Sequence, residues 1–142
     1  MSTTDESHSS ARRYKAVILY NVMSDFTPAD ICASEDAVTR MKMGLEANRL
    51  DVTTVAVRTD VRAALKDFDP REYVIFNWCE GLDGQPRAYD AVPPVLEAMG
   101  FAYTGADAWT LAVTQNKSKA KEIMIQAGVS TPESKTYSRA KK

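Results

Sequence analysis

The chain has 142 residues, 44% of them hydrophobic, and a net charge of −1, values typical of one soluble domain with a substantial core. No apolar run approaches the roughly 18 residues that span a bilayer, and the polar segment 1–14 lacks the apolar stretch of a signal peptide. We therefore expect a cytoplasmic protein that begins with a disordered leader at residues 1–14 and contacts neither membrane nor nucleic acid.

Opposite charges gather in two parts of the chain. Residues 1–115 hold 11 Lys and Arg against 17 Asp and Glu, a balance of −6, whereas residues 116–142 hold 7 against 2, a balance of +5. This asymmetry predicts a boundary near Asn116, with a basic part that meets an anion or another domain. A solvated helix followed by a basic end is the simpler alternative, and charge alone favours it.

Short apolar segments alternate along the chain with segments whose apolar residues recur at helical spacing. The predicted elements begin with a strand 15–22, a loop 23–31, a helix capped by Ser34 and running to about Arg49, a strand 51–57, a short helix capped by Thr59 or Asp60, and a strand 72–79. They continue with a polar loop 80–86, a helix 92–99 ended by Gly100, a strand 101–104, a brief helix 107–114, and a helix from Asn116 that Gly128 ends.

This alternation predicts an α/β fold with a small parallel sheet of about four strands over residues 15–105. The strand at 72–79 is expected to be buried on both faces, as in most parallel sheets. Ligands of such sheets bind at the carboxyl ends of the strands. Four segments therefore form the expected site, namely the loop 21–30, the turn 58–60, the loop 77–86 and Gly105.

Several common kinds of site are excluded by residue content. The single histidine, His8, lies in the leader, which rules out a histidine-based triad or metal cluster. Neither a dinucleotide fingerprint nor a phosphate-binding loop motif occurs. Cys32 and Cys79 form no C-x-x-C pair, so we expect two buried thiols and no metal site or disulfide.

Two local patterns suggest contact with a ligand. Asn77 and Glu80 directly follow a buried strand and precede Gly81 and Gly84, whose lack of side chains lets backbone N–H groups approach an anion. A well-formed turn in which Glu80 holds neighbouring backbone amides is the favoured alternative. Lys117 opens a helix, where the helix dipole disfavours a cation unless a phosphate lies nearby. A solvated lysine beside the Asn116 cap is the alternative that helix propensity alone favours.

The order of short motifs resembles a known family. A hydrophobic strand leads into Phe-Asn-x-x-Glu-Gly, then come Leu-Glu-Ala-Met-Gly, Tyr-Thr-Gly, Asn-Lys-x-x-x-Lys and Ala-Gly-Val-x-Thr-Pro, all within residues 72–132. This series is similar to the D-alanine–D-alanine ligase group of ATP-grasp enzymes. Over residues 15–71 the similarity is mainly architectural.

The resemblance implies that two parts of the chain belong to different domains. Residues 15–115 correspond to the Rossmann-like domain that precedes the ATP-grasp module, and residues 116–142 correspond to the incomplete start of that module. Glu35 is placed on the acidic residue that holds the substrate's ammonium group. Lys117 matches the lysine near the nucleotide phosphates, and Lys121 matches the second lysine of that stretch.

The family's reaction uses ATP and Mg²⁺ to form a peptide-type bond through an acyl-phosphate. The resemblance therefore implies a parent ligase whose partners are the remaining ATP-grasp domain, an amino-acid or carboxylate substrate and a second copy in a homodimer. This chain alone is expected to be inactive and to bind no cofactor tightly. The motifs depart from the family at Asn21, Asn77, Ala106 and Asn116, which argues for a substrate other than D-alanine. A free-standing Rossmann-like binding module is the alternative.

Overall fold

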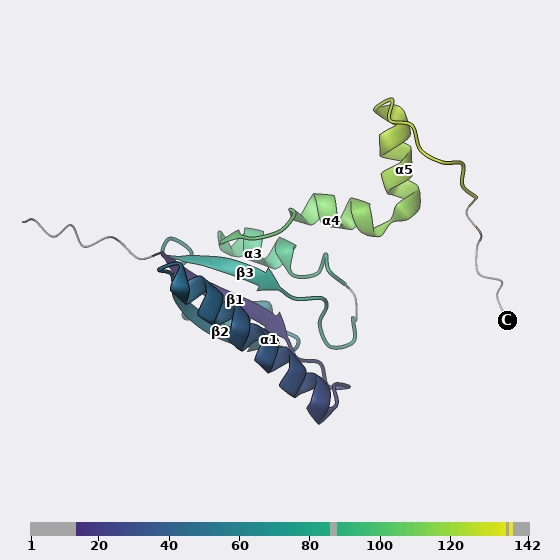
Figure 1. Ribbon diagram of the computed structural model, residues 1–142. Coiled ribbons are helices and arrows are strands. Elements are labelled where there is room, and N and C mark those ends of the chain that lie inside the picture. The colour runs from purple at the N-terminus through teal and green to yellow at the C-terminus, as the bar shows by residue number, and fades with distance from the viewer. Residues whose placement is uncertain (1–13, 86–87, 136, 138–142) are drawn as a thin grey trace, which may run out of the picture.

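The protein is seen in a computed structural model that describes residues 14–85, 88–135 and 137 (Figure 1). The predicted leader, apart from Tyr14, lies outside the described residues. The elements follow one another as β1 (Lys15–Asn21), α1 (Pro28–Ala47), β2 (Asp51–Val57), α2 (Val61–Leu65), β3 (Tyr73–Trp78), α3 (Pro93–Met99), β4 (Ala102–Tyr103), α4 (Ala108–Gln115) and α5 (Lys117–Gln126).

The four strands form one parallel sheet in the order β2-β1-β3-β4. Leu19 of β1 pairs with Val55 on one side and Asn77 on the other. All carboxyl ends of the strands therefore meet at one edge of the sheet. The predicted α/β fold with a Rossmann-like parallel sheet is confirmed.

Two apolar clusters lie on opposite faces of the sheet, because successive side chains of a strand point to opposite sides. Val17 and Leu19 of β1 face α2 and α3 and belong to the larger cluster, whose buried members are Val17, Leu19, Val57, Val61, Leu65, Ile75, Cys79, Val92, Leu96 and Phe101. Even-numbered residues face α1, which packs on them through the smaller cluster of Ala16, Ile18, Val38 and Val52. Figure 1 shows α1 lying along the β1–β2 side of the sheet.

The prediction that β3 is buried on both faces is wrong. Ile75 is fully buried among the residues that face α2 and α3, but its neighbour Val74 is 41% exposed. Val74 lies on the face that α1 covers, and α1 packs mainly over β1 and β2. A single helix on that face is too narrow to cover the β3–β4 half of the sheet.

The cap of the first helix lies seven residues before the predicted cap at Ser34. Thr27 caps it instead: its hydroxyl accepts from the Asp30 N–H at 3.2 Å, while Asp30 Oδ2 accepts from the Thr27 N–H at 2.9 Å. This reciprocal capping box, followed by Pro28 in the first turn, is a strong start signal. Cys32 lies on the exposed side of the extended helix, so the prediction of a buried thiol is wrong there and confirmed only for Cys79.

The remaining helix ends agree with the predictions. Asp60, Asp107 and Asn116 cap α2, α4 and α5 through their side chains, and Gly100 ends α3 in the left-handed conformation with φ of 80°. α5 contacts α4 and contains no buried residue. Figure 1 shows it turned away from the sheet. Within the described residues, no helix is both long and apolar enough to cross a lipid bilayer.

Candidate functional site

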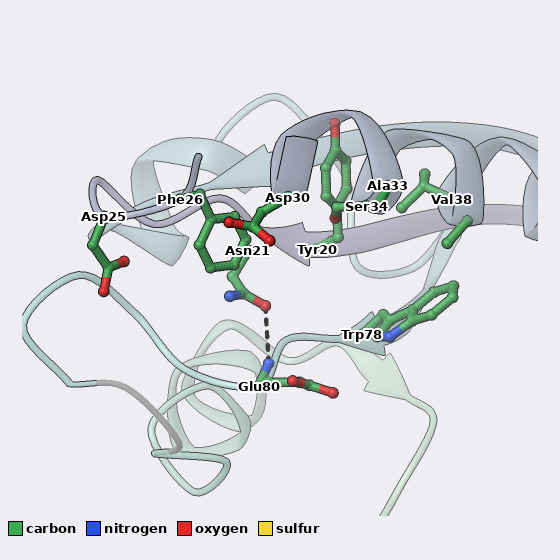
Figure 2. Close-up of a pocket in the computed structure, with 11 residues that line it drawn as sticks. Tyr20, Asn21, Asp25, Phe26, Asp30, Ala33, Ser34, Val38, Trp78 and Glu80 are labelled. Carbon is green, nitrogen blue, oxygen red and sulfur yellow. Dashed lines mark hydrogen bonds between the residues drawn. The ribbon is translucent and has the colours of Figure 1, made fainter. Parts of the chain in front are cut away.

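A cavity of about 510 Å³ opens at the carboxyl edge of the sheet, between the ends of β1 and β3 and the first turns of α1 (Figure 2). The chain forms it because β1 ends at Asn21, a short loop follows, and the capping box at Thr27 starts α1 close to the sheet edge. Its lining residues are Tyr20, Asn21, Asp25, Phe26, Asp30, Ala33, Ser34, Ala37, Val38, Trp78 and Glu80.

Carboxylates and aromatic rings dominate this lining. Asp25, Asp30 and Glu80 supply three carboxylates, and no Lys, Arg or His is among the lining residues. Hydrogen bonds from the hydroxyl and N–H groups of Thr27 lower the pKa of Asp30, so this carboxylate is ionised at neutral pH. Burial, and then the negative charge of Glu35, raise the pKa of Tyr20. The electrostatic potential in the cavity therefore favours a cation.

One buried side chain joins the two strand ends that frame the cavity. Asn21 is only 8% exposed, and its Oδ1 accepts a hydrogen bond of 3.0 Å from the Glu80 N–H (Figure 2). A hydrogen bond of the Cys79 thiol to the Leu19 carbonyl, 3.5 Å long, connects the same two strands. The backbone of Glu80 is thereby held against β1.

A second set of bonds holds the loops outside the cavity. Asp83 Oδ1 accepts from the Ser24 N–H at 2.6 Å, and the Asp83 N–H donates to the Arg58 carbonyl at 2.8 Å. Asp83 therefore links the segments that follow β1, β2 and β3. Three of the four segments predicted from the strand order therefore meet at one place, and the fourth, Gly105, is not among the residues that line the cavity.

Replacing Asn21 with alanine is expected to lower the free energy of unfolding by about 1–3 kcal/mol, since the Glu80 N–H loses its acceptor in a part-buried place. Urea unfolding followed by circular dichroism measures this. Asn48→Ala is the matched control, because Asn48 donates to the Gly44 carbonyl from an exposed position at the end of α1. An equal loss in both variants would contradict the anchoring role of Asn21.

The residues singled out from the sequence are placed in different parts of the structure. Glu80 lines the cavity, and its carboxylate has no hydrogen-bond partner recorded among the described residues. Asn77 lies on the opposite face of β3, where its Oδ1 accepts from the Cys79 N–H at 3.3 Å and its own N–H donates to Thr104 Oγ1 at 3.1 Å. In the turn after β3, Asn77 rather than Glu80 holds a neighbouring backbone amide.

Glu35 and Lys117 lie outside the cavity. Glu35 is exposed on α1, and its charge reaches the cavity through its effect on Tyr20. Lys117 is the exposed first residue of α5, a helix that lies away from the sheet edge (Figure 1). Lys121 lines a separate, shallow depression formed by the end of α5 and the segment 128–134.

Asp30, Tyr20 and Trp78 were not singled out from the sequence. Two signals could have found them. Thr27-Pro-Ala-Asp30 is a capping-box pattern, which places Asp30 in the first turn of a helix directly after β1. Tyr20 and Trp78 pair in the sheet register, so strand alternation puts both rings on the α1 face.

Comparison with known proteins identifies distant relatives over part of the chain. A D-alanine–D-alanine ligase of Moorella thermoacetica is 37% identical over 81 residues, which are 57% of this chain and 25% of that protein. The corresponding ligase of Methylobacterium radiotolerans is 32% identical over 95 residues, 67% of this chain and 29% of that protein.

The chain is a distant relative of D-alanine–D-alanine ligases. It spans between a quarter and a third of the length of these two ligases. An uncharacterised protein of Sinorhizobium fredii is also similar, at 37% identity over 59 residues. The sequence matches no protein-family model, and the comparison with solved structures finds no match.

Proposed function

We propose that the chain is the N-terminal part of an ATP-dependent carboxylate–amine ligase and that its cavity binds one of the two substrates. The observation that carries this proposal is the similarity to two D-alanine–D-alanine ligases, which reaches 67% of the chain. The cavity supports it independently, because it lies at the carboxyl edge of a parallel sheet, where ligands of such folds bind.

The chain's contribution to the reaction is to hold and orient a substrate. Asp30 and Glu80 can pair with an ammonium group, and Asn21 fixes the backbone of Glu80. Holding a substrate in one orientation lowers the entropic part of the barrier to bond formation. The side chains that line this cavity therefore suit the binding and alignment of a substrate.

The described residues do not themselves fit ATP with Mg²⁺. Lys117 offers one exposed cation at the start of α5, and it lines neither the cavity at the sheet edge nor the depression beside Lys121. Within the described part of the chain, no three His, Cys, Asp or Glu side chains are grouped so that they could hold a metal ion. We therefore assign nucleotide and metal binding to the remaining ATP-grasp part of the proposed ligase, with Lys117 at its border.

The gene downstream of codon 142 tests the proposal most simply. We expect it to continue into a region with glycine-rich and acidic ATP-grasp motifs, and we expect the purified 142-residue chain to hydrolyse no ATP. An in-frame stop at codon 143 in the natural gene, with a folded chain that binds small molecules, would instead establish a free-standing binding module. Sustained ligation by the chain alone would contradict the assignment of ATP binding to a further domain.

A further inference from the structure

The lining of the cavity carries information about the charge of its ligand. Asp25, Asp30 and Glu80 come from the loop after β1, from α1 and from the loop after β3, and no basic side chain lines the cavity to offset them. These carboxylates are not grouped closely enough to hold a metal ion. An organic cation with charges at more than one point fits such separated carboxylates better than a metal ion does.

Three aromatic side chains add a second preference for a cation. Tyr20, Phe26 and Trp78 line the same cavity, and Figure 2 shows Tyr20 and Trp78 reaching it from neighbouring strands. The faces of aromatic rings attract ammonium groups, with about 0.5–2 kcal/mol for each well-placed contact. Aliphatic parts of a ligand can pack against the same rings.

Asn21 supplies an independent sign of a ligand. Asn21 is more than nine-tenths buried and its Oδ1 accepts from the Glu80 N–H, whereas its Nδ2 donates to no other described residue. Each fully buried side-chain nitrogen or oxygen in the described part of the chain does have a partner, so this amide nitrogen keeps some accessible surface, and Asn21 is one of the residues that line the cavity. A donor in this position calls for an oxygen acceptor on the ligand.

The cavity has room for a ligand larger than alanine. About 510 Å³ is within the roughly 300–1,000 Å³ typical of sites that enclose complete small molecules. A three-carbon amino acid such as alanine would leave much of this space to water. It would also bring a single ammonium group to three carboxylates.

We propose that the cavity selects an amino acid with a cationic side chain, whose two positive groups meet the carboxylates of Asp30 and Glu80 and whose carboxylate accepts from Asn21 Nδ2. This assignment rests on the proposed function and names the substrate class of the same site. A basic amino acid has a net charge of +1 and offers one acceptor group and two cations. These groups match the amide donor of Asn21, the carboxylates and the aromatic rings that line the cavity.

Binding of lysine to the full 142-residue chain tests the proposal. In a Trp109→Phe background, Trp78 is the sole tryptophan, so its fluorescence reports directly on the cavity. We expect L-lysine or D-lysine to bind saturably, with a Kd at least about tenfold below those of alanine and Nε-acetyl-lysine, since acetylation removes a charge without shortening the side chain. Equal binding of acetylated and unmodified lysine, or no lysine binding, would overturn the proposal.

A charge-matched pair of variants shows whether the cavity carboxylates are responsible. Glu80→Gln is expected to weaken lysine binding about tenfold. It should also reduce the difference between the Kd of lysine and the Kd of Nε-acetyl-lysine. Asp67→Asn removes the same charge from an exposed site after α2, outside the lining residues, and should leave both affinities unchanged. Equal effects of the two variants would show a general charge effect and would also overturn the proposal.

These outcomes are distinguishable from a failure of the proposed function. If the complete protein ligates alanine with ATP and the cavity shows no preference for lysine, the substrate class is wrong and the ligase assignment stands. If lysine binds as expected and the complete protein has no ATP-dependent ligase activity, the binding site stands and the ligase assignment fails.

Discussion

Replacing Ile75 with alanine is expected to lower the free energy of unfolding by about 2–5 kcal/mol. Ile75 lies on β3 with no exposed surface, within the cluster that joins the sheet to α2 and α3. Removing its side chain leaves a cavity that the paired strands on either side cannot close. For a domain of this size, such a loss is a large share of the total stability, and urea unfolding followed by circular dichroism measures it.

The adjacent residue provides the matched control. Val74 precedes Ile75 on the same strand and points to the opposite face, where it is 41% exposed. Val74→Ala should cost no more than about 1 kcal/mol, because much of its side chain is already in contact with water. If both substitutions cost the same, β3 is buried equally on its two faces and the arrangement of helices described above is incorrect.

The two cysteines are expected to differ by orders of magnitude in reactivity. Burial raises the pKa of the Cys79 thiol to about 12, from an ordinary value of 9.0. At pH 8 this lowers its thiolate fraction about a thousandfold relative to an unperturbed thiol, and the thiolate is the reactive form. Cys32 is exposed on α1, where a reagent in solution can reach it.

Labelling with a thiol reagent that absorbs visible light, at pH 8, separates the two residues. We expect one rapid equivalent from Cys32 and a second, at least about a hundredfold slower, from Cys79. In Cys32→Ser the rapid phase should disappear, and in 6 M urea both thiols should react quickly. A rapid phase that survives in Cys32→Ser would contradict the burial of Cys79 between β1 and β3.

Most of the fold could be predicted from local chemistry. The structure agrees with the predicted apolar strands at residues 15–22 and 51–57, with a cap at Asp60 as one of the two predicted positions, with the cap at Asn116 and with the glycine stop at Gly100. Each of these signals acts over a few residues. The start of α1 was missed because Thr27 and Asp30 lie in a segment with Pro28, which suggested a loop. Their reciprocal hydrogen bonds are the feature that begins the helix.

Coverage of the sheet could not be predicted from strand composition. Tyr73–Trp78 is apolar enough for a strand buried on both faces, yet exposure of Val74 depends on where α1 crosses the sheet. That crossing is set by the packing of Val38 on Ala16, Ile18 and Val52, which are far apart in sequence. Such long-range packing cannot be recognised from the sequence of any one segment.

The candidate site could be predicted in part. Strand order indicates that the loops after β1 and β3 meet, and the cavity lies there with Glu80 in its lining. Asn77 looked equally suited, but the strand alternation puts its side chain on the other face, where it bonds to Cys79. Asp30 lines the same cavity as Glu80 because α1 begins at Thr27, so a helix start placed at Ser34 leaves out one of the three carboxylates of the lining.

The central claim, that the chain is part of a ligase that activates a carboxylate with ATP, is tested most directly by isotope transfer. The complete natural protein that contains this chain would be given ATP, Mg²⁺ and a panel of amino acids labelled with ¹⁸O in the carboxylate. Formation of an acyl-phosphate predicts ADP release that depends on the amino acid, with one ¹⁸O atom from the carboxylate recovered in each inorganic phosphate. Release of AMP and pyrophosphate, or of phosphate without ¹⁸O, would contradict the claim.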